Sequence, residues 1–308
     1  MPTQADKLIA EERKALMKLM DTEPYKVPSR KINENLVIAT WNIQQFSNRH
    51  TDRALQYVAD ICERFDIVAL QEVKTDLRGL QRLQSKLPGN YRILVSDPTG
   101  NSERFAFLYD KRSVYPTGIA SDIGFDVPAK THQGYQLHRM PYCASFRAGR
   151  FDFVIATAHI YFGKTAKERD QRREEIAALV DFIDRRARTD KEKVYDRDFF
   201  IVGDLNIEQE GDPFFDALRK RGFQMPKGMN SLTTNFARSQ TFDKIAWVNR
   251  KDFRPTGAFN VVPFYSAVFQ DRKTKGGKKE ISDHLPLWAE FEINSLTQQL
   301  DQILNPGS

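Results

Sequence analysis

The chain alternates short apolar runs with longer amphipathic segments, which is the pattern of a domain that mixes strands and helices. Apolar runs predict strands at 36–42, 67–70, 91–95, 105–109, 142–147, 151–158, 199–202, 241–247 and 287–291. Apolar residues on one face predict helices at 5–20, at 52–65 after a cap by Thr51 or Asp52, at 77–87, at 166–188, and a shorter one from Asp212-Pro213. Residues 116–138, rich in glycine, predict a loop. The elements therefore indicate one mixed α/β domain.

The domain has no internal linker, since we find neither a break in composition nor a repeat between its strands. We expect the catalytic part of such a domain to span 35–293. The first 34 residues then form a helical extension whose helix packs on the outside, and 294–308 form a C-terminal tail. The chain is thus expected to carry its chemistry in one unit.

Polar side chains follow several of the predicted strands, and the clearest case is the stretch 199–206. Four large apolar residues lead to Gly203, which permits a tight turn, and then to Asp204 and Asn206. Alternate residues of an extended segment share a face, so these two side chains could hold a water or a phosphate oxygen between them. The other strand ends carry Asn42, Glu72, His159, Asp243, and Asp283 with His284. Together they indicate one site at the rim of a sheet.

Composition narrows the class of protein. The 308 residues are 40% hydrophobic, which is enough for a sizeable core, and the formal net charge of +6 favours a polyanionic partner. Cys62 and Cys143 both lie in apolar patterns, which favours buried thiols over a disulfide. The N-terminus lacks an apolar signal segment, and no apolar stretch approaches the ~20 residues that span a bilayer. We therefore expect a cytoplasmic monomer without stable membrane insertion.

The polar strand ends belong to short motifs that occur in a fixed order along the chain. They are Thr-Trp-Asn at 40–42, Leu-Gln-Glu at 70–72, Arg-Met-Pro at 139–141, Ala-His at 158–159, Gly-Asp-Leu-Asn at 203–206, Phe-Asp-Lys-Ile at 242–245 and Ser-Asp-His-Leu-Pro at 282–286. This set resembles the endonuclease/exonuclease/phosphatase superfamily, and most closely its DNase I-like branch. The resemblance implies a four-layer α/β sandwich, with two packed mixed β-sheets flanked by helices and the site at one rim.

The residue types suit metal-assisted phosphodiester hydrolysis. Hard oxygen ligands favour Mg²⁺, with Mn²⁺ or Ca²⁺ as alternatives, and Glu72, Asn42 and Asp283 could supply them. His284 is the best general base, because imidazole titrates near neutral pH, and Asp243 would fix its tautomer.

The resemblance adds further roles. It implies that His159 approaches the scissile phosphate from the other side and pairs with Glu103, whose alternative interpretation is an exposed loop acid. Arg139 and Asn42 would hold the phosphate, and Lys74 would contact a phosphate or a groove. Asp204 and Asn206 would orient the attacking water and bind transition-state oxygens. The branch often has an aromatic residue where this chain has Asn101, which leaves groove readout there open.

We therefore expect a divalent-metal-dependent endonuclease that cuts DNA with little sequence specificity. The exposed basic segment 272–279 could clamp the nucleic-acid backbone through Lys273, Lys275, Lys278 and Lys279. Two alternatives remain, a phosphatase or phosphodiesterase acting on phosphoinositides or phospholipid head groups, and an inactive binding module. The aromatic run 259–269 could contact a membrane, although core packing explains it better. The sequence leaves open DNA or RNA, single or double strand, and endo- or exonuclease action.

Overall fold

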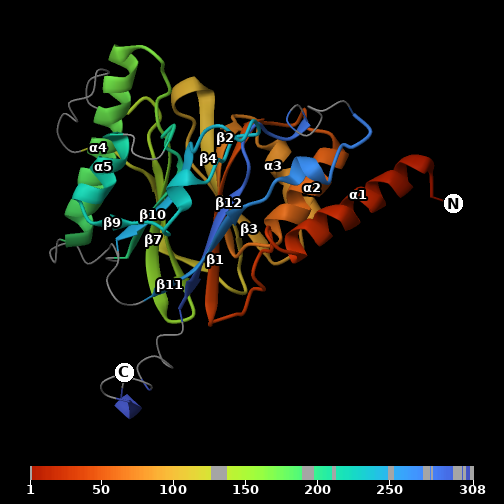
Figure 1. Cartoon of the computed structure of the whole chain (residues 1–308), viewed down its shortest axis with the longest axis horizontal. Helices are drawn as coiled ribbons and strands as arrows, with labels where there is room; N and C mark the ends of the chain where they lie inside the picture. Colours follow the sequence, from red (N-terminus) through yellow and green to blue (C-terminus); the bar gives the residue numbers. More distant parts are fainter. Residues whose placement is uncertain are drawn as a thin grey trace.

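A computed structural model of the chain describes residues 2–125, 137–188, 198–209, 213–248, 253–272, 278, 280–293, 300 and 303–305. Two six-stranded sheets form its centre, with helices on both outer faces (Figure 1). The expected four-layer α/β sandwich is therefore confirmed.

The first sheet has the strand order β11-β12-β1-β2-β4-β3. Its strands are β1 (Asn35–Phe46), β2 (Ile67–Lys74), β3 (Tyr91–Val95), β4 (Glu103–Asp110), β11 (Arg254–Val261) and β12 (Leu287–Glu292). β1 and β2 run parallel, and the other neighbours pair antiparallel. The predicted hairpin of 91–95 with 105–109 is confirmed as β3 and β4.

The second sheet has the order β5-β6-β7-β8-β10-β9. Its strands are β5 (Tyr115–Asp122), β6 (Tyr142–Ala148), β7 (Phe151–His159), β8 (Phe199–Asp204), β9 (Phe223–Gln224) and β10 (Asp243–Val248). β7 and β8 run parallel, so their carboxyl ends meet at one edge. The first and second sheets pack through aromatic contacts such as Phe200 with Phe291, whose ring centroids lie 5.1 Å apart.

The helices cover the two outer faces. The helices α1 (Gln4–Asp21), α2 (Asp52–Cys62) and α3 (Arg78–Lys86) lie outside the first sheet, and α4 (Ala166–Arg188) and α5 (Pro213–Lys220) lie outside the second (Figure 1). The expected Thr51 cap is present, since its side chain accepts from the Ala54 amide at 3.1 Å. Short 3₁₀ turns occur at η1 (Gly100–Ser102), η2 (Met229–Ser231) and η3 (Phe264–Ser266). Among the described residues, no helix is both long and apolar enough to cross a membrane.

The N-terminal helix α1 packs across the outside of the domain, as expected. Its Arg13 side chain donates to Asp60 of α2 at 2.7 and 2.9 Å, and Leu16 and Met20 are fully buried. Its Glu12 carboxylate pairs with Arg53 at 2.6 Å and accepts from the Gln270 amide at 2.8 Å. Helix α1 therefore contacts both α2 and the residues that precede the basic segment 272–279.

The prediction of a loop over 116–138 is wrong for its first part, because Tyr115–Asp122 forms strand β5. Pro116 and Gly118 concealed it, although both are tolerated at a sheet edge, where one side of the strand needs no hydrogen-bond partner. The register with β6 shifts between Pro116 and Ala120, which accommodates the irregularity. Residues 126–136 lie outside the described part of the chain.

Other predictions about burial are confirmed. Cys62 and Cys143 are buried and free. In the aromatic run, Phe264 and Phe269 are buried in the main core, so core packing accounts for these two rings. The start of the shorter helix at Asp212 and most of the tail 294–308 lie outside the described residues.

Candidate active site

Three candidate residues lie in one row across the second sheet. His159 at the end of β7 pairs in register with Asp204 at the end of β8, and Asp204 pairs with Asp243 at the start of β10. Gly203 makes this register possible, because its φ is +135° and a Cβ there would lie 2.0 Å from the Ala158 carbonyl oxygen. His159 Nε2 lies 3.6 Å from Asp204 Oδ2. The row therefore sets two carboxylates and an imidazole at the sheet rim.

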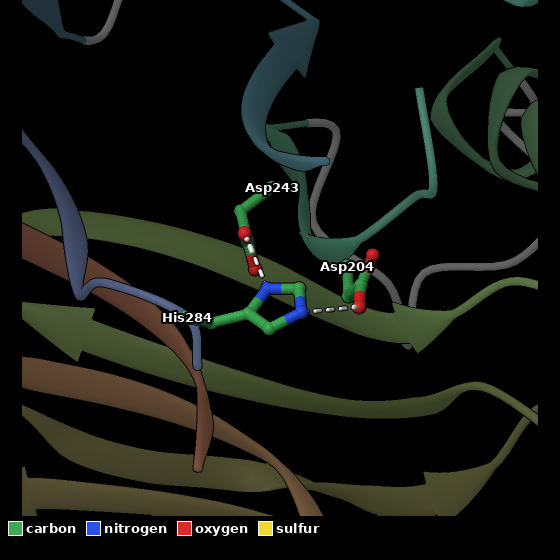
Figure 2. A group of neighbouring side chains, drawn as sticks. All are labelled: Asp204, Asp243 and His284. Atoms are coloured by element: carbon green, nitrogen blue, oxygen red, sulfur yellow. Dashed lines mark hydrogen bonds and ion pairs between the residues drawn. The ribbon is translucent and has the colours of Figure 1, made fainter. Parts of the chain in front are cut away.

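His284 joins this row from the turn before β12 (Figure 2). Its Nδ1 lies 2.9 Å from Asp243 Oδ2, and its Nε2 lies 3.7 Å from Asp204 Oδ2. The backbone is fixed too, since its carbonyl accepts from Trp41 Nε1 at 3.0 Å and its amide donates to Ser282 Oγ at 2.9 Å. His284 is thus oriented at both ring nitrogens and at its main chain.

The charges of His284, Asp243 and Asp204 affect one another's pKa values. Burial alone would lower the pKa of His284, but the negative charges of Asp243 and Asp204 raise it to about 10. Burial likewise opposes ionisation of Asp204, yet the positive charges of His284 and His159 lower its pKa. The two neighbouring carboxylates therefore favour the protonated form of the His284 imidazole.

The first sheet contributes Asn42 and Glu72 to the same rim. Asn42 Nδ2 donates to Glu72 Oε1 at 2.9 Å and to Asp204 Oδ2 at 3.1 Å, so one amide links carboxylates from both sheets. Glu72 lies within the register shift between Leu70 and Val73 and has a φ of +59°. Its other oxygen accepts from the Gln45 amide at 3.0 Å. The bulge brings this half-buried carboxylate to the rim, opposite Asp204.

A second charged group surrounds Glu103, which begins β4. Its carboxylate accepts from Arg139 Nε at 2.8 Å and lies 3.5 Å from His159 Nδ1 and 3.4 Å from Lys74 Nζ. Glu103 is 7% exposed, so it is a buried acid rather than an exposed loop acid. Burial would raise its pKa, but the interactions with His159 and Arg139 lower it to about 2. The expected proximity of Glu103 to His159 is therefore present.

The remaining predicted residues lie around this centre. Asn206 donates its side-chain amide to the Ile160 carbonyl at 2.7 Å, and its backbone amide donates to Asp204 Oδ1 at 3.1 Å. Asp283 is beside His284, and its carboxylate lies 3.7 Å from Lys278 Nζ. Lys278 is 45% exposed at the side chain, whereas Lys273, Lys275 and Lys279 lie outside the described residues. The roles of these residues stay predictions.

The donor set fits a divalent cation. Asp204, Asp243 and His284 offer ligand atoms that all lie within 4.8 Å of one another, so they could hold a metal ion. Glu72 and Asp204 also both accept from the Asn42 side-chain amide, so two further carboxylate oxygens lie close together where the two sheets meet. Carboxylate and amide oxygens at such a position suit hard cations.

Sequence reasoning missed two residues that shape the rim from α4. Arg172 is fully buried and donates to the Gly163 carbonyl at 2.9 Å and to the Asn206 carbonyl. Glu175, also fully buried, accepts from the His138 and Tyr161 amides at 3.0 and 2.9 Å. Both stand in the charged first half of α4, where sequence gives no sign that a charge faces inward. They fix the loop that follows His159.

Residues 39–284 match the Endonuclease/Exonuclease/phosphatase family, and the chain belongs to this family. A relative named deoxyribonuclease, from Thioalkalivibrio sp. (strain K90mix), is 28% identical over 85% of this chain and 72% of its own length. Deoxyribonuclease-1 of Rattus norvegicus is 34% identical, but only over 24% of this chain and 30% of its own length. The chain is thus similar to proteins named for DNA cleavage.

Solved structures show the same fold. Humanized D. rerio TDP2 aligns with a TM-score of 0.59 at 16% identity, covering 83% of this chain and 98% of that one. A mannosyl-6-phosphatase from Bacteroides thetaiotaomicron aligns with a TM-score of 0.55 at 17% identity, covering 83% and 99%. These similarities establish the fold and do not define the substrate.

Proposed function

We propose that this protein is a divalent-metal-dependent, DNase I-like endonuclease that hydrolyses DNA phosphodiesters with little sequence specificity. The observation that carries the proposal is the His284–Asp243 pair, at 2.9 Å, beside Asp204, which shares the Asn42 amide with Glu72 of the opposite sheet. A phosphodiester seated there would meet a proton acceptor on one side and His159 on the other. The deoxyribonuclease name of a relative matched over most of both chains supports DNA as the substrate.

His284 acts as the general base in this proposal. Asp243 accepts the proton of Nδ1, which leaves Nε2 as the nitrogen that takes a proton from water. Nε2 can do so only when His284 is neutral, and its raised pKa shows that the carboxylates oppose this state. A smaller negative charge on Asp204 or Asp243 would therefore favour the neutral imidazole. Asp204, with Asn206 beside it, would orient the attacking water.

The substrate phosphate would be held from the opposite side. His159 and Arg139 lie around Glu103, which balances their positive charge while leaving donors available for phosphate oxygens. Lys74 extends this positive group toward the neighbouring strand end. The basic segment with Lys273, Lys275, Lys278 and Lys279 would contact the nucleic-acid backbone beyond the site.

Glu72 would hold the metal, with Asn42 and Asp283 as further ligands and Mg²⁺ as the ion, or Mn²⁺ or Ca²⁺ in its place. When bound, the ion supplies positive charge that offsets these carboxylates and the charge that develops on the phosphoryl oxygens. Asp204, within hydrogen-bond distance of Asn42, lies close enough to share this position.

A phosphatase or phosphodiesterase acting on phosphoinositides or phospholipid head groups is the second candidate, because the fold also occurs in a sugar phosphatase. The burial of Phe264 and Phe269 removes much of the aromatic surface that a membrane-contacting segment would need. This observation favours nucleic acid. Within the phosphatase alternative, a soluble phosphomonoester is therefore a better candidate substrate than a membrane lipid.

The test is a substrate panel of plasmid DNA, single-stranded DNA, RNA and inositol phosphates, each with Mg²⁺, Mn²⁺, Ca²⁺ or a chelator. We expect plasmid nicking that requires a divalent metal and is abolished in His284→Ala. Glu34→Gln, which alters an exposed side chain in the segment before β1, serves as the control and should retain nicking. Full nicking by His284→Ala, or faster release of phosphate from inositol phosphates than cleavage of DNA, would refute the proposal.

A further inference from the structure

Phe162 is a large apolar side chain that stays exposed beside the candidate active site. It lies three residues after His159 and is 43% exposed. The other exposed large apolar residues that the structure describes are on α1, in the segment before β1, at the start of β5 and in the C-terminal tail. The proposed hydrolysis of a phosphodiester assigns no role to this exposed ring.

The loop that carries Phe162 is held in place on both sides. Glu175 accepts from the Tyr161 amide at 2.9 Å, and Arg172 donates to the Gly163 carbonyl at 2.9 Å. The Arg172 guanidinium also lies 5.7 Å from the centroid of the Phe162 ring, and Arg172 is fully buried. The ring is therefore supported from within the protein while its outer surface meets solvent. Such preorganisation lowers the entropy that the protein loses when a ligand stacks on the ring.

A second ring connects Phe162 with the general base. Phe242 lies 6.0 Å from Phe162, at an interplanar angle of 81°, and 5.7 Å from the His284 imidazole, nearly parallel to it at 29°. Phe242 directly precedes Asp243 and is half-buried. The two phenylalanines thus extend an aromatic surface from His284 outward. A group bound on it would lie beside the scissile phosphate.

We propose that Phe162, backed by Phe242, is a stacking platform for the base of an unpaired nucleotide next to the scissile phosphate. This inference rests on the proposed function and specifies its substrate. Every base offers an aromatic face, so stacking here needs no particular sequence. A base within a duplex is already stacked on its neighbours, and extruding it costs free energy. The platform therefore favours single-stranded or locally unpaired DNA over intact duplex.

The experiment is a double-mutant cycle between ring and base. A short single strand carries methylphosphonates at every linkage except one phosphodiester, and a tetrahydrofuran abasic residue replaces the base on either side of that linkage. Cleavage is measured as kcat/KM for the wild type and for Phe162→Ala. Affinity for the same strands is measured by fluorescence anisotropy with chelator present, so that binding is observed without hydrolysis.

We expect removal of the base at one of the two positions to weaken wild-type binding and kcat/KM by about 5- to 150-fold. Phe162→Ala should lose a similar factor on the intact strand and be nearly insensitive to the abasic residue. Phe162→Trp should restore the sensitivity. Tyr115→Ala removes a ring of similar exposure, 46%, and should behave as the wild type. Tyr115 pairs with Arg147, whose partner Asp152 lies near the start of β7, far from His159.

The outcomes separate this inference from the proposed function. Equal sensitivity of wild type and Phe162→Ala to the abasic residue at both positions, in both assays, overturns the platform while cleavage still supports the nuclease. Coupling in the anisotropy assay without any cleavage supports the platform and overturns the nuclease. Absence of both binding and cleavage overturns both.

Discussion

His284 lies between Asp243 and Asp204, so its pKa depends on the charge of both carboxylates. The replacement Asp243→Asn removes one negative charge and should lower the pKa of His284 from about 10 toward its ordinary value of 6.5. It should also reduce kcat by about 10²- to 10⁴-fold, because the imidazole loses its orienting partner. NMR titration of the imidazole in metal-free protein measures the pKa directly. An unchanged titration would show that Asp243 does not set the charge of His284.

The same shift has a consequence for stability. The folded pKa of His284 lies above 6.5, so the pair contributes its full stabilisation below pH 6.5 and loses it as pH rises toward 10. The stability difference between wild type and Asp243→Asn should therefore shrink at alkaline pH. Urea unfolding at pH 6 and at pH 10 measures this difference.

Glu103 titrates in the opposite direction. Its folded pKa of about 2 lies below the ordinary 4.5, so its interactions stabilise the fold above pH 4.5 and are lost as pH falls toward 2. Glu103→Gln should cost on the order of 1–2 kcal/mol at pH 7, after allowance for partial solvent screening, and much less at pH 3. Urea unfolding at the two pH values measures the change. Asp76→Asn, in an exposed ion pair with Arg78, is the control and should have little effect at either pH. A loss of the same size at pH 3 would count against the ionic interpretation.

At the scale of elements, the close approach of β7 and β8 depends on one glycine. Gly203→Ala places a Cβ 2.0 Å from the Ala158 carbonyl oxygen at a φ of +135°. We expect it to destabilise the fold by roughly 2–4 kcal/mol and to shift Asp204 away from His159. Thermal unfolding measures the first effect and kcat on plasmid the second. Gly89→Ala, where the added Cβ meets no atom within 4 Å, should be nearly neutral. A stable and fully active Gly203→Ala variant would contradict this account.

The sequence predicted those elements whose burial leaves a clear pattern. The strand 199–202 and its polar end at Asp204 could be located because a buried run stops abruptly at a rim. Strand β5 could not, since its edge position permits Pro116 and leaves most of its side chains exposed. The sequence indicated that Asn42 and Asp204 lie at one rim, but their direct hydrogen bond could not be predicted, because it depends on how two sheets pack. Arg172 and Glu175 were missed because an inward charge on a helix looks like any other charge.

At the scale of the whole molecule, the candidate site lies across two sheets, and a ligand bound by both would hold them together. If Glu72 is a metal ligand, Mg²⁺ at 100 times its dissociation constant should stabilise the protein by about 2.7 kcal/mol, and chelator should remove this gain. Thermal unfolding with and without the ion measures the shift independently of activity.

Variants identify the ligands in that measurement. Glu72→Gln should abolish the stabilisation, whereas Glu34→Gln, an exposed glutamate in a 3.9 Å pair with Lys31, should leave it intact. Asp283→Asn should weaken the shift if Asp283 is a further ligand. A full shift in Glu72→Gln would place the ion elsewhere, with the Asp204, Asp243 and His284 group as the next candidate.

The hydrogen bond from Ser282 Oγ to the Asn42 carbonyl, 2.6 Å long, joins residues 240 positions apart in the chain. We expect contacts across such long sequence separations to form after the local helices and hairpins, because closing a long loop costs more entropy than closing a short one. A chain emerging from the ribosome has Asn42, Glu72 and His159 long before it has His284. The rim can therefore assemble only after His284 has been synthesised, and under the proposed function the recovery of nicking during refolding would measure the fraction of molecules whose two sheets have docked.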